Sequence, residues 1–158
     1  MDKEYYTNRI SKAGPVGLVA LNFEITLDFL LKARKMYNTD VTESRHCIIR
    51  AKEGIENLIQ SLDFEVPLSF DFYEIYKYLY GILSDAHASG DAGKAIKTLD
   101  EVIEHMESFS NVWKQLAENT AEEPIRTDGA PKIYAGLTYG KDGKAAEYID
   151  EPATGYKA

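Results

Sequence analysis

Proline is missing from two long stretches of this sequence, residues 16–66 and 68–123. Because proline lacks a backbone N–H and clashes with the preceding helical turn, it is rarely found inside helices. Apolar residues recur within these stretches at steps of three and four, the spacing of one face of a helix. Together the two features predict a helical body that ends near residue 120, followed by a segment of a different kind.

The apolar spacing predicts four helices of similar length. We expect them at residues 16–37, 42–62, 69–89 and 93–119. Pro15 suits the first turn of the first helix, and Thr42 or Ser44 is expected to cap the second. Gly90 is placed to end the third. Each helix is amphipathic, so mutual burial has to stabilise all four. The expected fold is all-α, an antiparallel up-down four-helix bundle with a short N-terminal segment.

The last part of the chain, residues 121–158, loses the helical spacing. Apolar residues alternate with others over 132–139, which is the period of a strand, and Asp142-Gly143 is a common hairpin turn. A hairpin is marginal alone, so this segment is expected either to pack on the bundle as a β-hairpin or to be a disordered acidic tail. We therefore divide the chain into a bundle domain, 1–120, and a C-terminal extension, 121–158.

Charge and composition exclude several classes of protein. The 158 residues include 26 acidic and 18 basic ones, a net charge of -8, which argues against general binding to nucleic acid or anionic membranes. No apolar run approaches the roughly 20 residues of a membrane span, and the polar N-terminus does not resemble a signal peptide. The single cysteine, Cys47, excludes an intramolecular disulfide and suits a reducing compartment. We expect a soluble cytoplasmic protein without membrane insertion.

The sequence offers little that resembles an active site. A ferritin-like di-iron centre needs Glu-x-x-His on two helices, and only Glu43 and His46 have that spacing. Zinc sites need several Cys or His ligands, whereas Cys47 beside His46 is a lone pair. No glycine-rich loop continues into the Lys-Ser/Thr of a phosphate-binding motif. The prediction is a protein that is not an enzyme and has no metal site and no cofactor.

Aromatic residues crowd the third predicted helix. They are Phe70, Phe72, Tyr73, Tyr76, Tyr78 and Tyr80. Such a helix has almost no polar face, so it is either a central helix touched by three neighbours or one wall of a groove. Tyrosine and phenylalanine are common in grooves that receive an apolar helix of a partner.

The N-terminal stretch from Tyr5 to Pro15 resembles the start of the FliS family, the flagellin export chaperones. Members of that family open with a tyrosine, a few polar residues, an aliphatic residue and then Thr-Ala-Ser-Pro before the first helix. The residues that fit in register are Tyr5, Asn8, Ile10, Ala13 and Pro15. The departures from the family pattern are Lys12, Gly14, Glu24 and Ile25. Further similarities are Ser61-Leu62-Asp63, Ile75–Leu79 and the aliphatic run from Leu99 to Trp113. The resemblance covers about residues 5–118.

The resemblance implies a cytosolic chaperone. It would bind the C-terminal segment of newly made flagellin, prevent premature polymerisation and help to deliver its client to the flagellar export gate. The residues expected to bind the partner match family positions or extend the apolar stripes. They are Tyr5, Ile10, Ile48, Ile55, Leu62, Tyr76, Leu79 and Trp113. The alternatives are a helical-bundle interaction or regulatory protein with a different partner, and a ferritin-like metal enzyme.

The C-terminal extension is not part of the family pattern. Its segment Lys132–Tyr139 carries alternating apolar residues where a plain linker would be polar. One hypothesis is that this segment lies across the bundle and shields the groove when no client is bound.

Overall fold

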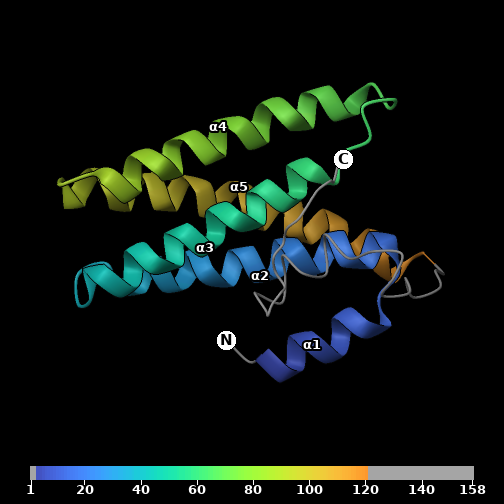
Figure 1. Ribbon diagram of the computed structural model, residues 1–158, viewed down its shortest axis with the longest axis horizontal. Coiled ribbons are helices and arrows are strands. Elements are labelled where there is room, and N and C mark those ends of the chain that lie inside the picture. Colours follow the sequence, from blue (N-terminus) through green and yellow to red (C-terminus); the bar gives the residue numbers. More distant parts are fainter. Residues whose placement is uncertain (1–2, 121–158) are drawn as a thin grey trace.

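The computed structural model describes residues 3–120, and these residues form five helices (Figure 1). The helices are α1 (Lys3–Lys12), α2 (Pro15–Met36), α3 (Val41–Gln60), α4 (Leu68–Ala88) and α5 (Ala92–Glu118). Within residues 3–120 there is no strand, which confirms the all-helical prediction for the body of the chain. The hairpin predicted in the C-terminal extension lies outside the described residues. In the described part of the chain, no helix is both long and apolar enough to cross a membrane.

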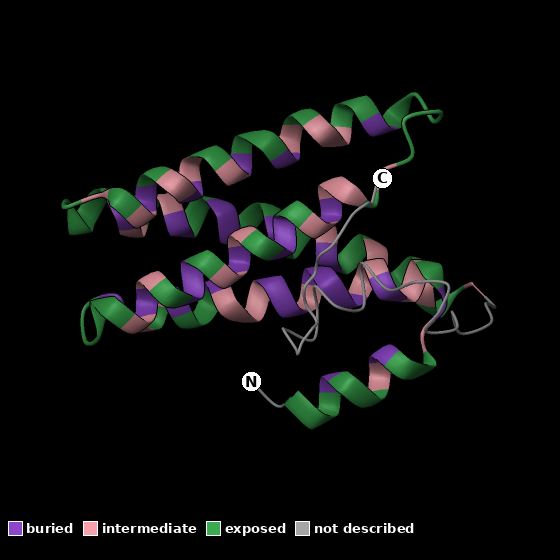
Figure 2. Cartoon of the chain, in the orientation of Figure 1, coloured by how far each residue is buried: buried purple, intermediate pink, exposed green. Residues whose placement is uncertain are grey.

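The four long helices form an antiparallel bundle, as predicted. The backbone of α2 lies beside α3 and α5, and α4 lies beside the same two helices on the far side. The short helix α1 packs on α2 alone among the described elements. The helix with three neighbours is therefore α2, and the alternative that placed the aromatic-rich α4 at the centre is wrong. Two flanks of α4 are covered, and its outer face is exposed (Figure 2).

The start of α3 differs from the sequence-based prediction. Its cap is Asp40, whose carboxylate accepts a hydrogen bond of 3.0 Å from the backbone N–H of Glu43. Thr42 and Ser44 already lie inside the helix. Ser44 is buried and donates a 2.7 Å hydrogen bond to the carbonyl of Ala33 in α2. An aspartate just before the first turn satisfies a free N–H there, so neither of the two predicted caps is needed.

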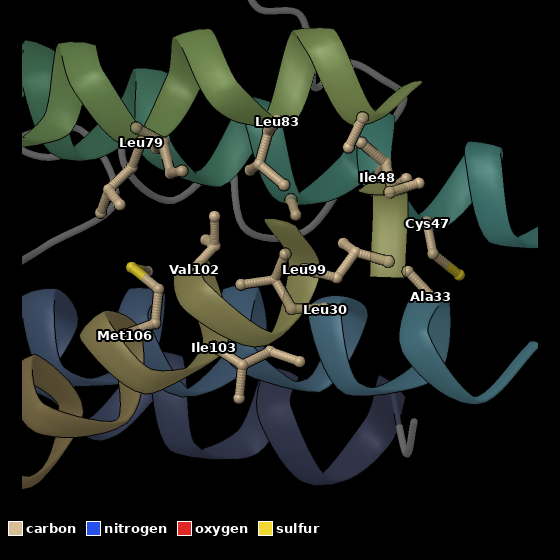
Figure 3. Close-up of a cluster of buried hydrophobic side chains, with 14 of the residues drawn as sticks. Leu30, Ala33, Cys47, Ile48, Leu79, Leu83, Leu99, Val102, Ile103 and Met106 are labelled. Atoms are coloured by element: carbon tan, nitrogen blue, oxygen red, sulfur yellow. The ribbon is translucent and has the colours of Figure 1, made fainter. Parts of the chain in front are cut away.

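The core lies between α2, α3, α4 and α5, which all contribute fully buried side chains (Figure 3). The largest of these are Phe23, Leu30, Ile48, Ile55, Leu58, Leu79, Leu83, Leu99, Val102 and Met106. Burial of one such side chain stabilises a fold by roughly 1.5–3 kcal/mol. The apolar stripes predicted for the four helices thus meet in one core.

Helices α2 and α3 pack closely at Gly54. A Cβ atom at this position would lie 2.0 Å from the Oγ1 atom of Thr26. Thr26 donates a 3.0 Å hydrogen bond to the side-chain oxygen of Asn22, and the Asn22 amide donates a 3.3 Å bond to the Gly54 carbonyl. All three residues are buried, and buried polar groups are costly without partners. Glycine at position 54 therefore permits both the helix contact and its hydrogen bonds.

The helix α1 replaces the short N-terminal segment of the prediction. It buries Tyr6 and Ile10 against apolar residues of α2. Those residues are Leu18, Leu21 and Ile25. The Tyr6 hydroxyl donates a hydrogen bond to the Asp28 carboxylate, and burial together with that carboxylate raises the pKa of Tyr6. A side helix with one neighbour is thus held by two buried residues, a charge-assisted hydrogen bond and an ion pair between Arg9 and Glu24.

Gly54→Ala should lower the free energy of unfolding by about 1–3 kcal/mol, the usual cost of overpacking a core. The methyl group would collide with Thr26 or force it out of its hydrogen bond, which outweighs the gain of about 1 kcal/mol in helix propensity. The matched control is Gly81→Ala, because a Cβ at this exposed helical position meets nothing within 4 Å. We expect the control to be stabilised by up to about 1 kcal/mol. Urea denaturation measures both, and equal effects would contradict the proposed contact.

Tyr6→Phe should detach α1 and leave the bundle intact. The variant loses a hydrogen bond to a carboxylate, worth about 1.5–3 kcal/mol, so amide protons of α1 should exchange roughly tenfold faster or more. Tyr5→Phe is the control, because Tyr5 is exposed and its hydroxyl accepts a bond from Arg9 of the same helix. Hydrogen exchange followed by mass spectrometry resolves both segments. Faster exchange throughout α5 in Tyr6→Phe would show that α1 is not a separate unit.

Candidate protein-binding surface

Five aromatic rings from three helices meet at one end of the bundle. Phe23 comes from α2, Phe72 and Tyr76 come from α4, and Phe109 and Trp113 come from α5. The ring centroid of Phe109 lies 5.8 Å from that of Phe23 and 6.2 Å from that of Phe72. Trp113 stacks on Phe23 with centroids 6.3 Å apart. We refer to these five residues as the aromatic cluster.

The aromatic cluster has a buried floor and a half-buried upper layer. Phe23 and Tyr76 are buried, and burial raises the pKa of the Tyr76 hydroxyl. Phe72, Phe109 and Trp113 pack on the core but keep part of their surface exposed to solvent. Aromatic groups with large area and few rotamers are effective contact residues in protein interfaces.

The end of α5 extends the cluster outward. Helices α4 and α5 are close at the turn that joins them and separate toward the opposite end (Figure 1). The last buried residue of α5 is Ser110, although the helix continues to Glu118. Beyond it, Val112 is 63% exposed and Leu116 is also exposed, one turn further on. We call Val112 and Leu116 the α5 rim, because they adjoin Trp113 in an apolar strip that no other described helix covers.

Two tyrosines of α4 have a different role. Tyr78 donates a 2.6 Å hydrogen bond to Glu101 of α5, and Tyr80 donates one of 2.8 Å to Glu56 of α3. The Glu56 bond, with burial and the nearby negative charge, raises the pKa of Tyr80 to about 12. These hydroxyls join α4 to its neighbours on both sides. Part of the aromatic excess in this helix is therefore structural.

The structure places half of the predicted partner-binding residues in the core. The residues buried in the core between the four long helices are Ile48, Ile55, Leu79 and Tyr76, and a fifth, Ile10, is buried between α1 and α2. Tyr76 also forms the floor of the aromatic cluster, where Trp113 lies in the upper layer. The structure thus brings two of the eight predicted residues into one site.

The remaining predicted residues lie elsewhere. Leu62 follows the end of α3 and is half-buried against the core. Ile10 is buried between α1 and α2, whereas Tyr5 is exposed on α1. These three residues do not belong to the aromatic cluster.

The predicted partner-binding residues omit five residues of this surface, Phe23, Phe72, Phe109, Val112 and Leu116. A signal was present, because apolar residues continue at steps of three and four along α5 well past Met106. Such spacing normally marks a buried face. It could not show that the last two turns of the helix lack a neighbour.

A shallow groove with both apolar and charged lining residues lies between α1, α2 and α5 and has a volume of about 280 Å³. The charged residues that line it are Arg9, Lys12, Glu24, Lys114 and Glu118. Arg9 pairs with Glu24 at 2.9 Å, so much of the charge is neutralised within the groove. Its lining has no nucleophile with an adjacent base, so the groove does not resemble an active site.

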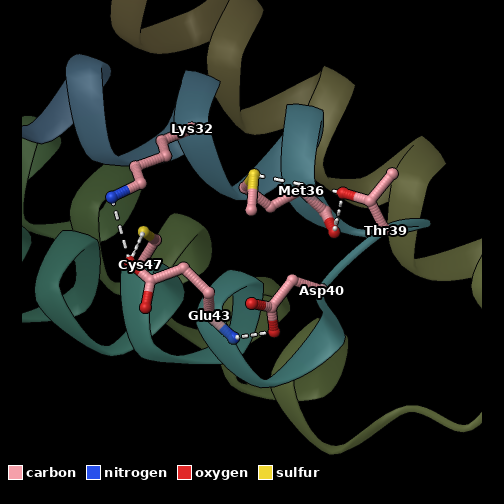
Figure 4. A network of polar contacts seen from close by, with 6 residues as sticks. All are labelled: Lys32, Met36, Thr39, Asp40, Glu43 and Cys47. Atoms are coloured by element: carbon pink, nitrogen blue, oxygen red, sulfur yellow. Dashed lines mark hydrogen bonds and ion pairs between the residues drawn. The ribbon is translucent and has the colours of Figure 1, made fainter.

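The Glu43 and His46 spacing does not form part of a larger ligand set. Within residues 3–120, no group of three or more His, Cys, Asp or Glu side chains could hold a metal ion. Glu43 pairs with Lys32 at 3.0 Å and accepts a weak bond from the Cys47 thiol, as Figure 4 shows. Burial and the Glu43 carboxylate raise the pKa of Cys47, which disfavours the reactive thiolate. The network at this end of the bundle joins α2 to α3.

The sequence was compared with known proteins. Residues 1–120 match the sequence family described as "Flagellar protein FliS". A curated relative, the Flagellar secretion chaperone FliS of Bacillus subtilis (strain 168), is 27% identical over 120 residues. The aligned part is 75% of this chain and 87% of the relative. The family match spans all five helices and the whole candidate surface.

The α5 rim should be dispensable for folding. Val112→Ser with Leu116→Ser should change the free energy of unfolding by less than about 1 kcal/mol, because both side chains are exposed. Met106→Ala on the same helix removes a fully buried side chain and should cost about 2–5 kcal/mol. Urea denaturation followed by circular dichroism measures both. If the free energy of unfolding fell by a similar amount in the two variants, the rim would be part of the core.

Proposed function

The chain belongs to the FliS family of flagellar proteins, and on this premise we propose that it is a flagellar secretion chaperone that binds the C-terminal segment of flagellin. It would act in the cytoplasm, prevent polymerisation of its client and help to deliver it to the export gate. The observation that carries this proposal is the aromatic cluster together with the α5 rim. Both present apolar surface that the described part of the chain leaves uncovered.

The chemistry of the surface suits a client that folds on binding. A disordered segment loses conformational entropy when it becomes a helix, so it needs a large apolar contact area to bind tightly. An amphipathic helix presents apolar side chains at steps of three and four along one face. Trp113, Val112 and Leu116 have the same spacing on α5. We infer that the client helix packs along the end of α5 with the half-buried rings beneath it.

The predicted partner-binding residues then have different roles. Trp113 contacts the client directly, and Tyr76 forms the floor of the site. Leu62 extends the contact at its margin, Ile10 fixes α1 next to α2, and the exposed Tyr5 of α1 does not belong to the aromatic cluster. The three remaining residues keep the helices in place from within the core. They are Ile48, Ile55 and Leu79.

Isothermal titration with a synthetic peptide of the C-terminal flagellin residues from the same organism tests the proposal. We expect saturable one-to-one binding with a negative heat-capacity change, the signature of apolar burial. Val112→Ser with Leu116→Ser should weaken binding at least about tenfold, because each buried apolar side chain contributes roughly 1.5–3 kcal/mol and 1.4 kcal/mol is tenfold.

The matched control is Leu31→Ser with Ile49→Ser, two similarly exposed apolar residues on α2 and α3. The flagellin peptide should bind this control variant with the same affinity as the unmodified chain. If only the control variant bound the flagellin peptide more weakly, the client would lie on the α2–α3 face, which would contradict the proposed surface. Absence of heat with the unmodified chain at micromolar concentrations would contradict the proposed function itself.

A further inference from the structure

A second apolar patch surrounds the turn between α3 and α4. It consists of Phe64, Val66, Leu68 and Phe70, which are between 40% and 56% exposed. The Phe64 ring lies 5.1 Å from that of Phe70. Phe70 and Phe72 are two positions apart and so point to nearly opposite sides of α4, which separates this turn patch from the aromatic cluster. The turn patch does not enter the proposed contact with flagellin.

Hydrogen bonds within the turn hold the patch in position. The Asp63 carbonyl accepts a 2.7 Å bond from the Ser69 hydroxyl and a 3.0 Å bond from the Val66 N–H. The Asp63 carboxylate accepts a 3.0 Å bond from the N–H of Glu65. The exposed apolar side chains are therefore presented by an ordered turn. Contiguous apolar surface of this kind, with polar residues around it, usually marks an interaction site.

The turn patch lies in a negatively charged part of the chain. Residues 61–74 contain four carboxylates and no lysine or arginine, which gives a local net charge of -4. The four are Asp63, Glu65, Asp71 and Glu74. A segment that binds here should therefore combine apolar side chains with positive charge.

The turn patch is at the end of the bundle where α5 stops. Phe72 near the start of α4 contacts Phe109 in the second half of α5, so these parts of the two helices lie together. The α3–α4 turn and the end of α5 are on the same side of the bundle in Figure 1. The chain beyond Thr120 therefore starts from the end of the molecule that carries the turn patch.

We propose that the segment Lys132–Tyr139 of the same chain docks on the turn patch. Its apolar residues are Ile133, Tyr134, Leu137 and Tyr139. Residues 131–144 contain three lysines and one aspartate, a net charge of +2, and thus complement the -4 of the turn. The rest of the extension has two basic and six acidic residues, so its positive charge is concentrated in the docking segment and the five residues that follow it.

The chain length permits this contact. About 12 residues separate Thr120 from Lys132, and at about 3.3–3.6 Å per residue they reach up to roughly 40 Å. Neighbouring helices in a bundle are only about 8–10 Å apart. Because the segment is attached to the surface that it binds, a high effective concentration compensates for a small contact area.

Photo-crosslinking in the full-length chain tests the proposal. The photoreactive amino acid p-benzoylphenylalanine replaces Tyr134, and mass spectrometry maps its products. We expect crosslinks to residues 62–73 within one chain. The control carries the same group at Tyr156, outside the docking segment, and should give no preference for the turn. Mixing chains labelled with nitrogen-14 and nitrogen-15 distinguishes crosslinks within one chain from those between two copies.

A charge-reversal variant tests the electrostatic part of the proposal. It combines Lys132→Glu, Lys141→Glu and Lys144→Glu. We expect its crosslinks to the turn to fall to the level of the Tyr156 control. The matched control makes the same charge change at the opposite end of the bundle with Lys35→Glu, Lys94→Glu and Lys97→Glu. This control should keep the crosslinks of the unmodified chain.

Three outcomes would overturn the proposal. Crosslinks spread over α2 and α5 would show that the segment has no preferred site on the bundle. Crosslinks only between differently labelled chains would assign the patch to a second copy. Full retention of the crosslinks in the charge-reversal variant would contradict the argument from charge. None of these outcomes depends on flagellin, so they are distinct from failure of the proposed function.

Discussion

The contact between α2 and α3 at Gly54 fixes how closely the two helices at the centre of the contact network can pack. Only a residue without a side chain allows the two backbones to come this close, since a Cβ there would meet the Thr26 hydroxyl at 2.0 Å. Separation of the helices would also leave Asn22 and Gly54 without their mutual hydrogen bond. The steric fit at Gly54 and the hydrogen bond from Asn22 thus favour the same distance between α2 and α3. With α3 fixed on one side of α2, the remaining sides of α2 are free for α5 and α1.

The exposed apolar surface follows from the position of α4, which lies away from α2. This helix has no backbone contact with α2 and is held by α3 and α5 through the core and through two tyrosine hydroxyls. It separates from α5 toward the start of α4 (Figure 1). The rings of Phe72 and Phe109 are in contact between the two helices there. The end of α5 consequently lacks a covering helix. The same arrangement that closes the core at one end leaves the aromatic cluster and the α5 rim exposed at the other.

Periodicity in the sequence predicted the four long helices to within two residues at each end, because each has a full apolar stripe. The helix α1 was missed since its burial depends on only Tyr6 and Ile10 and on residues of α2. Sequence also could not separate core from surface. Ile55 and Leu116 both lie in predicted apolar stripes, yet one is fully buried and the other exposed. The difference arises from the angle between α4 and α5, which no local pattern of residues encodes.

The position of Trp113 has a practical consequence. It is the one tryptophan among the 158 residues, and it stacks on Phe23 beside the exposed Val112. Indole emission shifts with the polarity of its surroundings, so the chain has an intrinsic fluorescent reporter at the surface where a client would bind. Its emission can be used to measure ligand binding and unfolding, both for the unmodified chain and for surface variants. No added label is needed, and a label would itself alter an apolar surface.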